Sequence, residues 1–92
     1  MVTDLSKLPN IGKDTETKLM MVGITSYAEL RALGTEQAFL KLQAIDSGAC
    51  LQLLYGLEGA IEGIPATNLP QNKKQELREF HRMAKKLCSR NT

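Results

Sequence analysis

The 92-residue sequence has few of the residues from which metal centres and redox sites are built. It contains one histidine, His81, and two cysteines, Cys50 and Cys88, which lie 38 residues apart. These numbers exclude a multi-histidine metal site and a C-x-x-C zinc or redox motif. Small chains with a disulfide framework use more cysteines, so we expect both to be reduced, and we expect no metal and no cofactor.

The sequence also lacks three common catalytic motifs, G-x-S-x-G, G-x-x-x-x-G-K-[ST] and H-E-x-x-H. Two pairs of side chains remain as alternatives. His81 and Cys88 would lie two helical turns apart, about 10 Å along the axis, which is beyond hydrogen-bond reach. Glu58 and Glu62 share one helical face, where we expect a solvated edge because a small core hardly supplies a catalytic cleft. We therefore predict that the protein is not an enzyme.

No apolar run approaches the roughly 18–20 residues that cross a membrane. The N-terminal residues show no basic start followed by an apolar stretch, so no signal peptide is expected. These two absences predict a cytoplasmic protein without membrane contact. The length suits one small domain, which we place at residues 1–92.

What the sequence does contain is helical periodicity, interrupted by glycine and proline. It predicts an all-α fold, a single compact domain of about five helices. A weak first turn is expected over residues 3–7, with Thr3 as its N-cap. The helices are expected at 13–22, between caps at 26 and 34, at 36–45, at 49–63 and at 71–89.

Several boundaries carry a local signal. Gly23 fits the left-handed residue that ends a helix. Ser26 and Glu29 have the S-x-x-E spacing of a capping box. The Asp-Ser-Gly segment at 46–48 is expected to break the chain before the next helix, and Pro65 to follow its end.

The segment 49–63 is the most apolar, so we expect it at the centre of the domain. Gly56, Gly59 and Gly63 form one stripe along it, although each glycine costs a helix about 1 kcal/mol against alanine. The stripe indicates close approach by another backbone. Two alternatives are packing inside the monomer and an interface between the subunits of a homodimer.

The net charge of +2 is unevenly distributed. Residues 1–46 carry five Lys and Arg against six Asp and Glu, whereas residues 73–90 carry seven against two. Five of these bases fall on one arc of the last predicted helix: Lys74, Arg78, Arg82, Lys85 and Lys86. The arc is either a solvated face or a surface that follows nucleic-acid phosphates. Because no aromatic residue alternates with the bases, only weak and non-specific DNA contact is expected.

The turn at residues 8–13, Leu-Pro-Asn-Ile-Gly-Lys, resembles the hairpin of helix-hairpin-helix domains. That hairpin usually carries glycine where this chain has Asn10. The resemblance implies that the turn and the first amides of the following helix contact a phosphate, with Asn10, Gly12 and Lys13 as the candidate residues. The alternative is a purely structural turn.

A longer series of motifs includes this turn, the segment Val22–Leu30, the segment Leu53–Ala60 and Gly63-Ile64. Together they resemble the C-terminal domain of the TfoX/Sxy family, regulators of natural competence. The resemblance implies a helix-hairpin-helix or SAM-like fold, a bacterial cytoplasmic setting and a link to transcriptional control of DNA-uptake genes. In that family the regulator is thought to act with a cyclic-AMP-responsive activator. The family commonly has a separate N-terminal domain, so we expect a stand-alone copy here.

These observations favour a non-enzymatic, regulatory binding module that acts through protein contacts and weak, non-specific DNA binding. The expected protein partner is the transcription machinery or an activator. The alternative is a protein-interaction or self-association domain with no nucleic-acid role.

Overall fold

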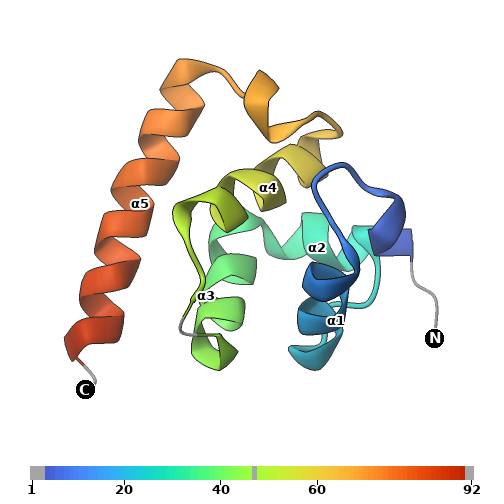
Figure 1. Ribbon diagram of the computed structural model, residues 1–92, viewed down its shortest axis with the longest axis horizontal. Coiled ribbons are helices and arrows are strands. Elements are labelled where there is room, and N and C mark those ends of the chain that lie inside the picture. Colours follow the sequence, from blue (N-terminus) through green and yellow to red (C-terminus); the bar gives the residue numbers. More distant parts are fainter. Residues whose placement is uncertain (1–3, 47, 91–92) are drawn as a thin grey trace.

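The computed structural model describes residues 4–46 and 48–90, and the side chains of the last helix as far as residue 86. The described part is all-α and forms a single domain, as predicted (Figure 1). The elements are η1 (Asp4–Lys7), α1 (Lys13–Met21), α2 (Tyr27–Leu33), α3 (Thr35–Ile45), α4 (Leu51–Glu62), η2 (Ala66–Asn68) and α5 (Gln71–Arg90), where η marks a short 3-10 helix.

The local signals at Gly23 and Ser26 are confirmed. Gly23 has a φ of 88°, and its N–H donates to the carbonyl of Met20 at 3.1 Å, while the next N–H reaches back to Leu19 at 2.9 Å. This pair of bonds is the Schellman ending of a helix. The Ser26 hydroxyl accepts from the Glu29 N–H at 3.1 Å, so the capping box starts α2.

α4 lies at the centre of the domain, as its composition predicted. It packs against α2, α3, α5 and η2, and Figure 1 shows it between α5 on one side and α1 on the other. Leu54, Leu57 and Ala60 are fully buried along it. Burying aliphatic side chains on one face contributes about 1.5–3 kcal/mol for each large residue, which is why the most apolar helix takes this position.

Phe39 of α3 connects the core to α5. Its ring is fully buried and meets the ring of Phe80 edge-to-face, with 6.3 Å between centroids. Leu77 and Ala84 are buried on the same face of α5. The predicted apolar face of this helix is thereby confirmed as far as residue 84, and Leu87 and Cys88 lie outside the described side chains.

The structure differs from the predicted elements most clearly at α4 and at η2, and the ends of α1, α3 and α5 shift by one residue. The helix expected at 49–63 begins at Leu51 and ends at Glu62, so Gly63 caps the helix and is not part of its body. The short helix η2 had no counterpart in the predicted elements. Thr3, the predicted N-cap, and Ser47 lie outside the described residues. No helix in the described ranges is long and apolar enough to span a membrane.

Candidate functional site

The turn at residues 8–12 is fastened to the end of α4 by one side chain, Asn10. Its Nδ2 donates to the carbonyl of Ile64 at 3.1 Å and, at 3.5 Å, to that of Gly56. Its Oδ1 accepts from the N–H of Ala66 at 3.1 Å. Asn10 also has a φ of 69°, a left-handed conformation that asparagine tolerates better than most residues. Asn10 therefore adopts a backbone conformation open to glycine and adds an amide clamp that glycine lacks.

The glycine stripe of α4 is what allows the turn to come so close. A Cβ at Gly59 would lie 2.5 Å from Asn10 Nδ2 and 2.6 Å from the Ile64 carbonyl oxygen. A Cβ at Gly56 would lie 3.4 Å from that of Asn10, which is ordinary contact. Gly63 has a φ of 77° and ends the helix in the left-handed region. Gly56 and Gly59 thus pack inside the monomer, the first of the two alternatives that the sequence left open.

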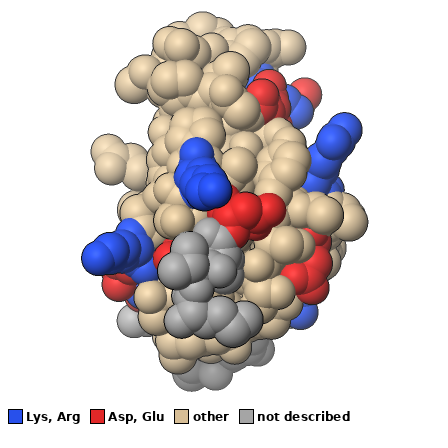
Figure 2. Space-filling view, turned by 90° about the vertical axis from the view of Figure 1, so that its right-hand side faces the viewer, with Lys and Arg blue, Asp and Glu red and all other residues tan. Residues whose placement is uncertain are grey.

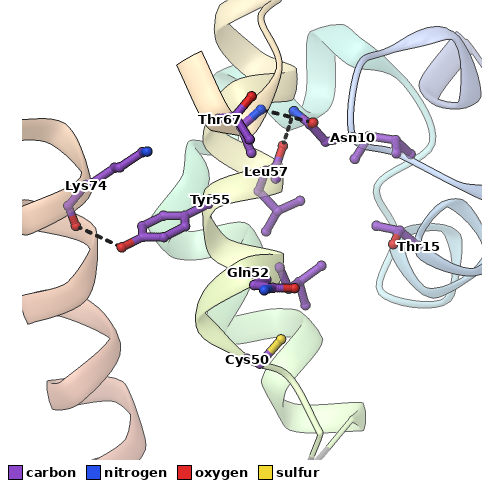
Figure 3. A pocket seen from close by; sticks show the side chains of 12 residues that line it. Asn10, Thr15, Cys50, Gln52, Tyr55, Leu57, Thr67 and Lys74 are labelled. Atoms are coloured by element: carbon purple, nitrogen blue, oxygen red, sulfur yellow. Dashed lines mark hydrogen bonds between the residues drawn. The ribbon is translucent and has the colours of Figure 1, made fainter. Parts of the chain in front are cut away.

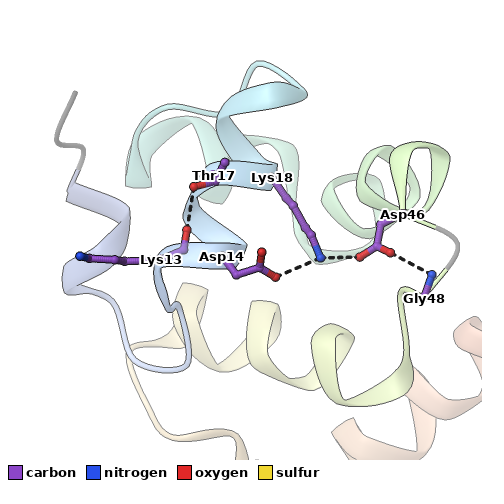
Figure 4. Close-up of polar contacts among 6 residues, drawn as sticks. All are labelled: Lys13, Asp14, Thr17, Lys18, Asp46 and Gly48. Carbon is purple, nitrogen blue, oxygen red and sulfur yellow. Dashed lines mark hydrogen bonds and ion pairs between the residues drawn. The ribbon is translucent and has the colours of Figure 1, made fainter.

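The three candidate phosphate-contact residues of the hairpin therefore differ in their exposure and in their hydrogen-bond partners within the chain. Both polar atoms of the Asn10 side chain have partners within the chain. Gly12 is exposed and forms the N-cap of α1 without a side-chain hydrogen bond to that helix end. Lys13 is exposed and points away from the neighbouring ion pairs (Figure 4). The phosphate contact of these three residues stays a prediction.

The opposite end of α1 is tied to α3 by ion pairs. Lys18 Nζ lies 2.7 Å from Asp46 Oδ2 and 3.0 Å from Asp14 Oδ2 (Figure 4). The hydrogen bond with Asp46, followed by that with Asp14, raises the pKa of Lys18, and the bond from Lys18 lowers the pKa of Asp46. The face of the molecule on the side of the N-terminus carries scattered cations and carboxylates on a largely uncharged surface (Figure 2).

Most of the described cations of α5 have no ion-pair partner. Among the described residues the one ion pair of this helix joins Lys73 to Glu76, at 3.4 Å. The arc predicted from the sequence is outside that pair: Arg78, Arg82, Lys85 and Lys86 are exposed, and Lys74 is half-buried. Arg78 donates to the Tyr55 hydroxyl at 3.4 Å. The structure places this arc and the hairpin on separate elements on either side of α4 (Figure 1).

A groove of about 650 Å³ runs across α4 between the start of α1 and the start of α5. Leu53 and Leu57 of α4 line its floor, Thr15 of α1 lines one wall and Lys74 of α5 the other (Figure 3). The Tyr55 hydroxyl donates to the backbone carbonyl of Lys74 at 3.5 Å, which connects floor and wall.

Sequence reasoning missed the groove. Its residues come from separate helices, and their spacing within any one helix is that of ordinary packing. The half-buried Leu53 and Tyr55 therefore carried no local signal that distinguished them from core residues.

Of the two paired carboxylates, Glu58 lines a separate hollow of about 280 Å³ next to α3. Thr35 donates to Glu58 Oε1 at 2.8 Å, and Glu58 is half-buried while Glu62 is exposed. A hydrogen bond with Glu58 raises the pKa of Glu62. Burial acts against ionisation of Glu58, but its bonds with Glu62 and Thr35 leave its pKa lowered.

The remaining catalytic and metal alternatives can be located as well. His81 packs its ring against Phe39, with 5.8 Å between ring centroids. The side chain of Cys88 lies outside the described residues. Within the described ranges, no group of three or more His, Cys, Asp or Glu side chains is placed to hold a metal ion.

Comparison with known families gives a match over most of the sequence. The model of the TfoX C-terminal domain matches residues 1–81. Protein Sxy of Escherichia coli K12 is 40% identical over 76 residues, which cover 83% of this chain and 36% of Sxy. DNA transformation protein TfoX of Haemophilus influenzae is 37% identical over 73 residues, covering 79% of this chain and 34% of that protein. The chain thus spans about a third of the length of these curated relatives.

Two crystal structures have the same fold. An uncharacterised protein from Listeria monocytogenes, in a triclinic form, superposes with a TM-score of 0.86 at 44% identity, over 88% of this chain and 92% of that one. A protein of unknown function from the same organism, in a tetragonal form, gives a TM-score of 0.83 at 44% identity, over 86% of this chain and 98% of that one.

Proposed function

The chain belongs to the family of TfoX C-terminal domains, and on that premise we propose that it is a non-enzymatic regulatory module that contacts a protein partner and, weakly, duplex DNA. The relatives support the regulatory setting, since one of them is a DNA transformation protein and the other is Sxy. The module would act in the bacterial cytoplasm, together with a transcriptional activator or the transcription machinery.

The observation that carries the DNA part of the proposal is the row of unpaired cations on α5. Arg78, Arg82 and Lys86 are exposed and spaced by four residues, so their Cα atoms follow one another at about 6 Å along the helix. No carboxylate within the described part of the chain forms an ion pair with them. Cations without a carboxylate partner are free to neutralise phosphates and release counterions.

The same surface favours weak and non-specific contact. Its reach is limited to long, flexible side chains on one helix, and no aromatic residue of α5 alternates with them on their face. Phosphate contacts position a protein on DNA without reading its sequence. We therefore expect similar affinity for duplexes of unrelated sequence, and loss of binding as salt rises.

Fluorescence anisotropy of a labelled 20-base-pair duplex tests this. The variant Arg78→Gln/Arg82→Gln/Lys86→Gln should bind less tightly than the wild type. If all three cations touch phosphates, the slope of log affinity against log salt should fall by about 2.7, at about 0.9 per contact. The matched control Lys7→Gln/Arg31→Gln/Lys41→Gln removes the same charge from exposed positions outside α5 and should retain the wild-type slope.

Two outcomes would remove the DNA part of the proposal: no binding at low salt, or an equal loss in both triple variants.

A second candidate function, self-association, is favoured by the exposed side chains of Met21, Ile45 and Met83, which are 69%, 46% and 64% accessible. Light scattering over a wide range of concentrations tests it, and a strict monomer would rule it out.

A further inference from the structure

We propose that the groove between α1 and α5 binds an acidic, amphipathic segment of the protein partner. The inference rests on the proposed regulatory function and specifies the chemistry of the partner for that function. It follows from the groove's shape, its aliphatic floor and the sign of the charges around it.

The floor is suited to a bulky apolar side chain. Leu53 is half-buried although it belongs to the most apolar helix, so part of its side chain faces solvent in the groove. Ala66 extends the apolar surface toward η2, and the buried side chains of Ile11 and Leu57 lie beneath it. A cavity of about 650 Å³ is within the roughly 300–1,000 Å³ of binding pockets, and covering aliphatic surface is favourable by about 25 cal/mol per Å².

The charge of the groove has one sign. Lys74 is the charged side chain among the described residues that line it, and none of them is a carboxylate. Figure 3 shows the Lys74 side chain extending from α5 above Tyr55, on the side that faces α4. Arg78 lies next to it through its hydrogen bond to Tyr55, and neither cation has an ion-pair partner within the described ranges.

The opposite wall places no carboxylate in the groove. Thr15 stands in the first turn of α1, a helix whose N-cap residue, Gly12, supplies no side-chain hydrogen bond to the exposed amides. The partial positive charge at the N-terminal end of the helix is offset by the first-turn carboxylates Asp14 and Glu16, so the cations of α5 carry the charge argument. The acidic residue Asp14 is turned toward Lys18 and does not line the groove (Figure 4).

The combination favours a protein segment over nucleic acid at this site. A sugar-phosphate backbone would match the cations but would leave the aliphatic floor without a partner. A segment that places a large apolar side chain on Leu53, with carboxylates on either side, matches both features. Amphipathic segments that insert into a groove are a common mode of recognition between proteins.

Selection from a phage-displayed library of random 12-residue peptides, with the full chain as bait, tests the chemistry without assuming a sequence. Counter-selection uses the variant Leu53→Gln, which makes the floor polar at a half-buried position. Enriched peptides should be net negative and contain bulky apolar residues. Enrichment of basic or purely polar peptides, or no enrichment over the counter-selection, would overturn the proposal.

A charge exchange then tests the site. The variant Lys74→Glu should bind the selected peptide about tenfold or more less tightly than the wild type, because like charges in an interface repel. A peptide in which the neighbouring glutamate is replaced by lysine should recover affinity for Lys74→Glu and lose it for the wild type. The control Lys41→Glu changes an exposed cation on α3 and should leave the affinity unchanged. Since recovery requires a folded protein, a failure to recover would contradict the proposal.

Failure of the groove proposal can be distinguished from failure of the proposed regulatory function. Suppose that peptides selected on the wild type without counter-selection still bind Leu53→Gln but are lost on Arg82→Gln/Lys86→Gln. The groove proposal is then wrong, while a regulatory module that binds protein through α5 still stands. Conversely, a peptide that needs Leu53 and Lys74 supports the groove even if duplex DNA does not bind.

Discussion

The turn at residues 8–12 and the outer face of α5 were both predicted to contact phosphate, but their polar side chains differ in whether they have partners within the chain. In the turn, the side chain of Asn10 is committed to Ile64, Gly56 and Ala66. On α5, the cations of the arc have no carboxylate partner among the described residues. The polar side chain of Asn10 in the turn therefore holds the fold, whereas the cations of the arc on α5 remain available to solvent and to ligands.

The difference shows what a sequence motif leaves open. A Pro-x-apolar-Gly turn specifies a backbone shape, and that shape serves equally well for packing and for binding an anion. What decides between them is whether the donors are already satisfied, which depends on residues about 50 positions away. The following variants are chosen to break or sharpen the contrast between the two regions.

The largest effect is expected at Gly59. Gly59→Ala would force a Cβ against Asn10 Nδ2 and the Ile64 carbonyl, at 2.5 and 2.6 Å, so we expect a loss of about 3 kcal/mol in the free energy of unfolding. Gly56→Ala is the matched control, because its Cβ has room and alanine favours the helix by up to about 1 kcal/mol. Urea denaturation measures both, and equal losses in the two variants would contradict the close approach at Gly59.

Asn10 should come next. Asn10→Ala removes the amide clamp and leaves a residue poorly suited to a φ of 69°, for an expected loss of about 2 kcal/mol. Asn10→Gly keeps the backbone conformation and loses the clamp alone, so about half of that loss is expected. Thermal and urea unfolding of the pair separate the two contributions. If Asn10→Gly were as stable as the wild type, the clamp would contribute nothing.

A pH-dependent effect is expected at Asp46, a charge held by the fold. Its pKa is lowered by the bond from Lys18, so its stabilising contribution is present above the ordinary aspartate pKa of about 3.9 and is lost as the pH falls through the lower folded value. Asp46→Asn should therefore be less stable than the wild type at pH 7, with the difference shrinking below about pH 4. Asparagine can still accept from the Gly48 N–H, so the turn is preserved. A difference that stays constant with pH would exclude the ion pair as its source.

The smallest effect is expected at Glu62. The hydrogen bond with Glu58 raises its pKa, so ionised Glu62 disfavours the folded state, and the wild type gains stability as the pH falls through this raised value. Glu62→Gln should stabilise the protein at pH 7 by at most about 0.5 kcal/mol, because solvent screens an exposed group. The gain should vanish below about pH 4. Urea midpoints at pH 7 and pH 3.5 check the sign, and a loss of stability at pH 7 would contradict it.

Much of the fold could be predicted from the sequence because the signals that determine it are local. Gly23, the Ser26–Glu29 box and the apolar run of α4 each act through neighbours within a few residues, and each prediction was confirmed. The family resemblance was confirmed as well. The helix at 66–68 was not predicted, because a single 3-10 turn is too short to show a hydrophobic periodicity.

The site was harder to predict because its geometry is tertiary. The clamp at Asn10 joins residues 46 to 56 positions apart, and no local spacing encodes it. The groove combines side chains of α1, α4 and α5, whose relative placement only packing determines. The arc on α5 could be listed from a helical wheel, but its lack of ion-pair partners depends on where the acidic residues of the other helices lie.

The most direct test of the contrast is a titration of the ¹⁵N-labelled protein with a short DNA duplex at low salt, followed by the backbone amide shifts. The account predicts that the shifts concentrate in α5, over residues 74–86, and that the amides of residues 10–14 stay in place. Shifts centred on the turn and the first amides of α1, or none at all, would contradict it.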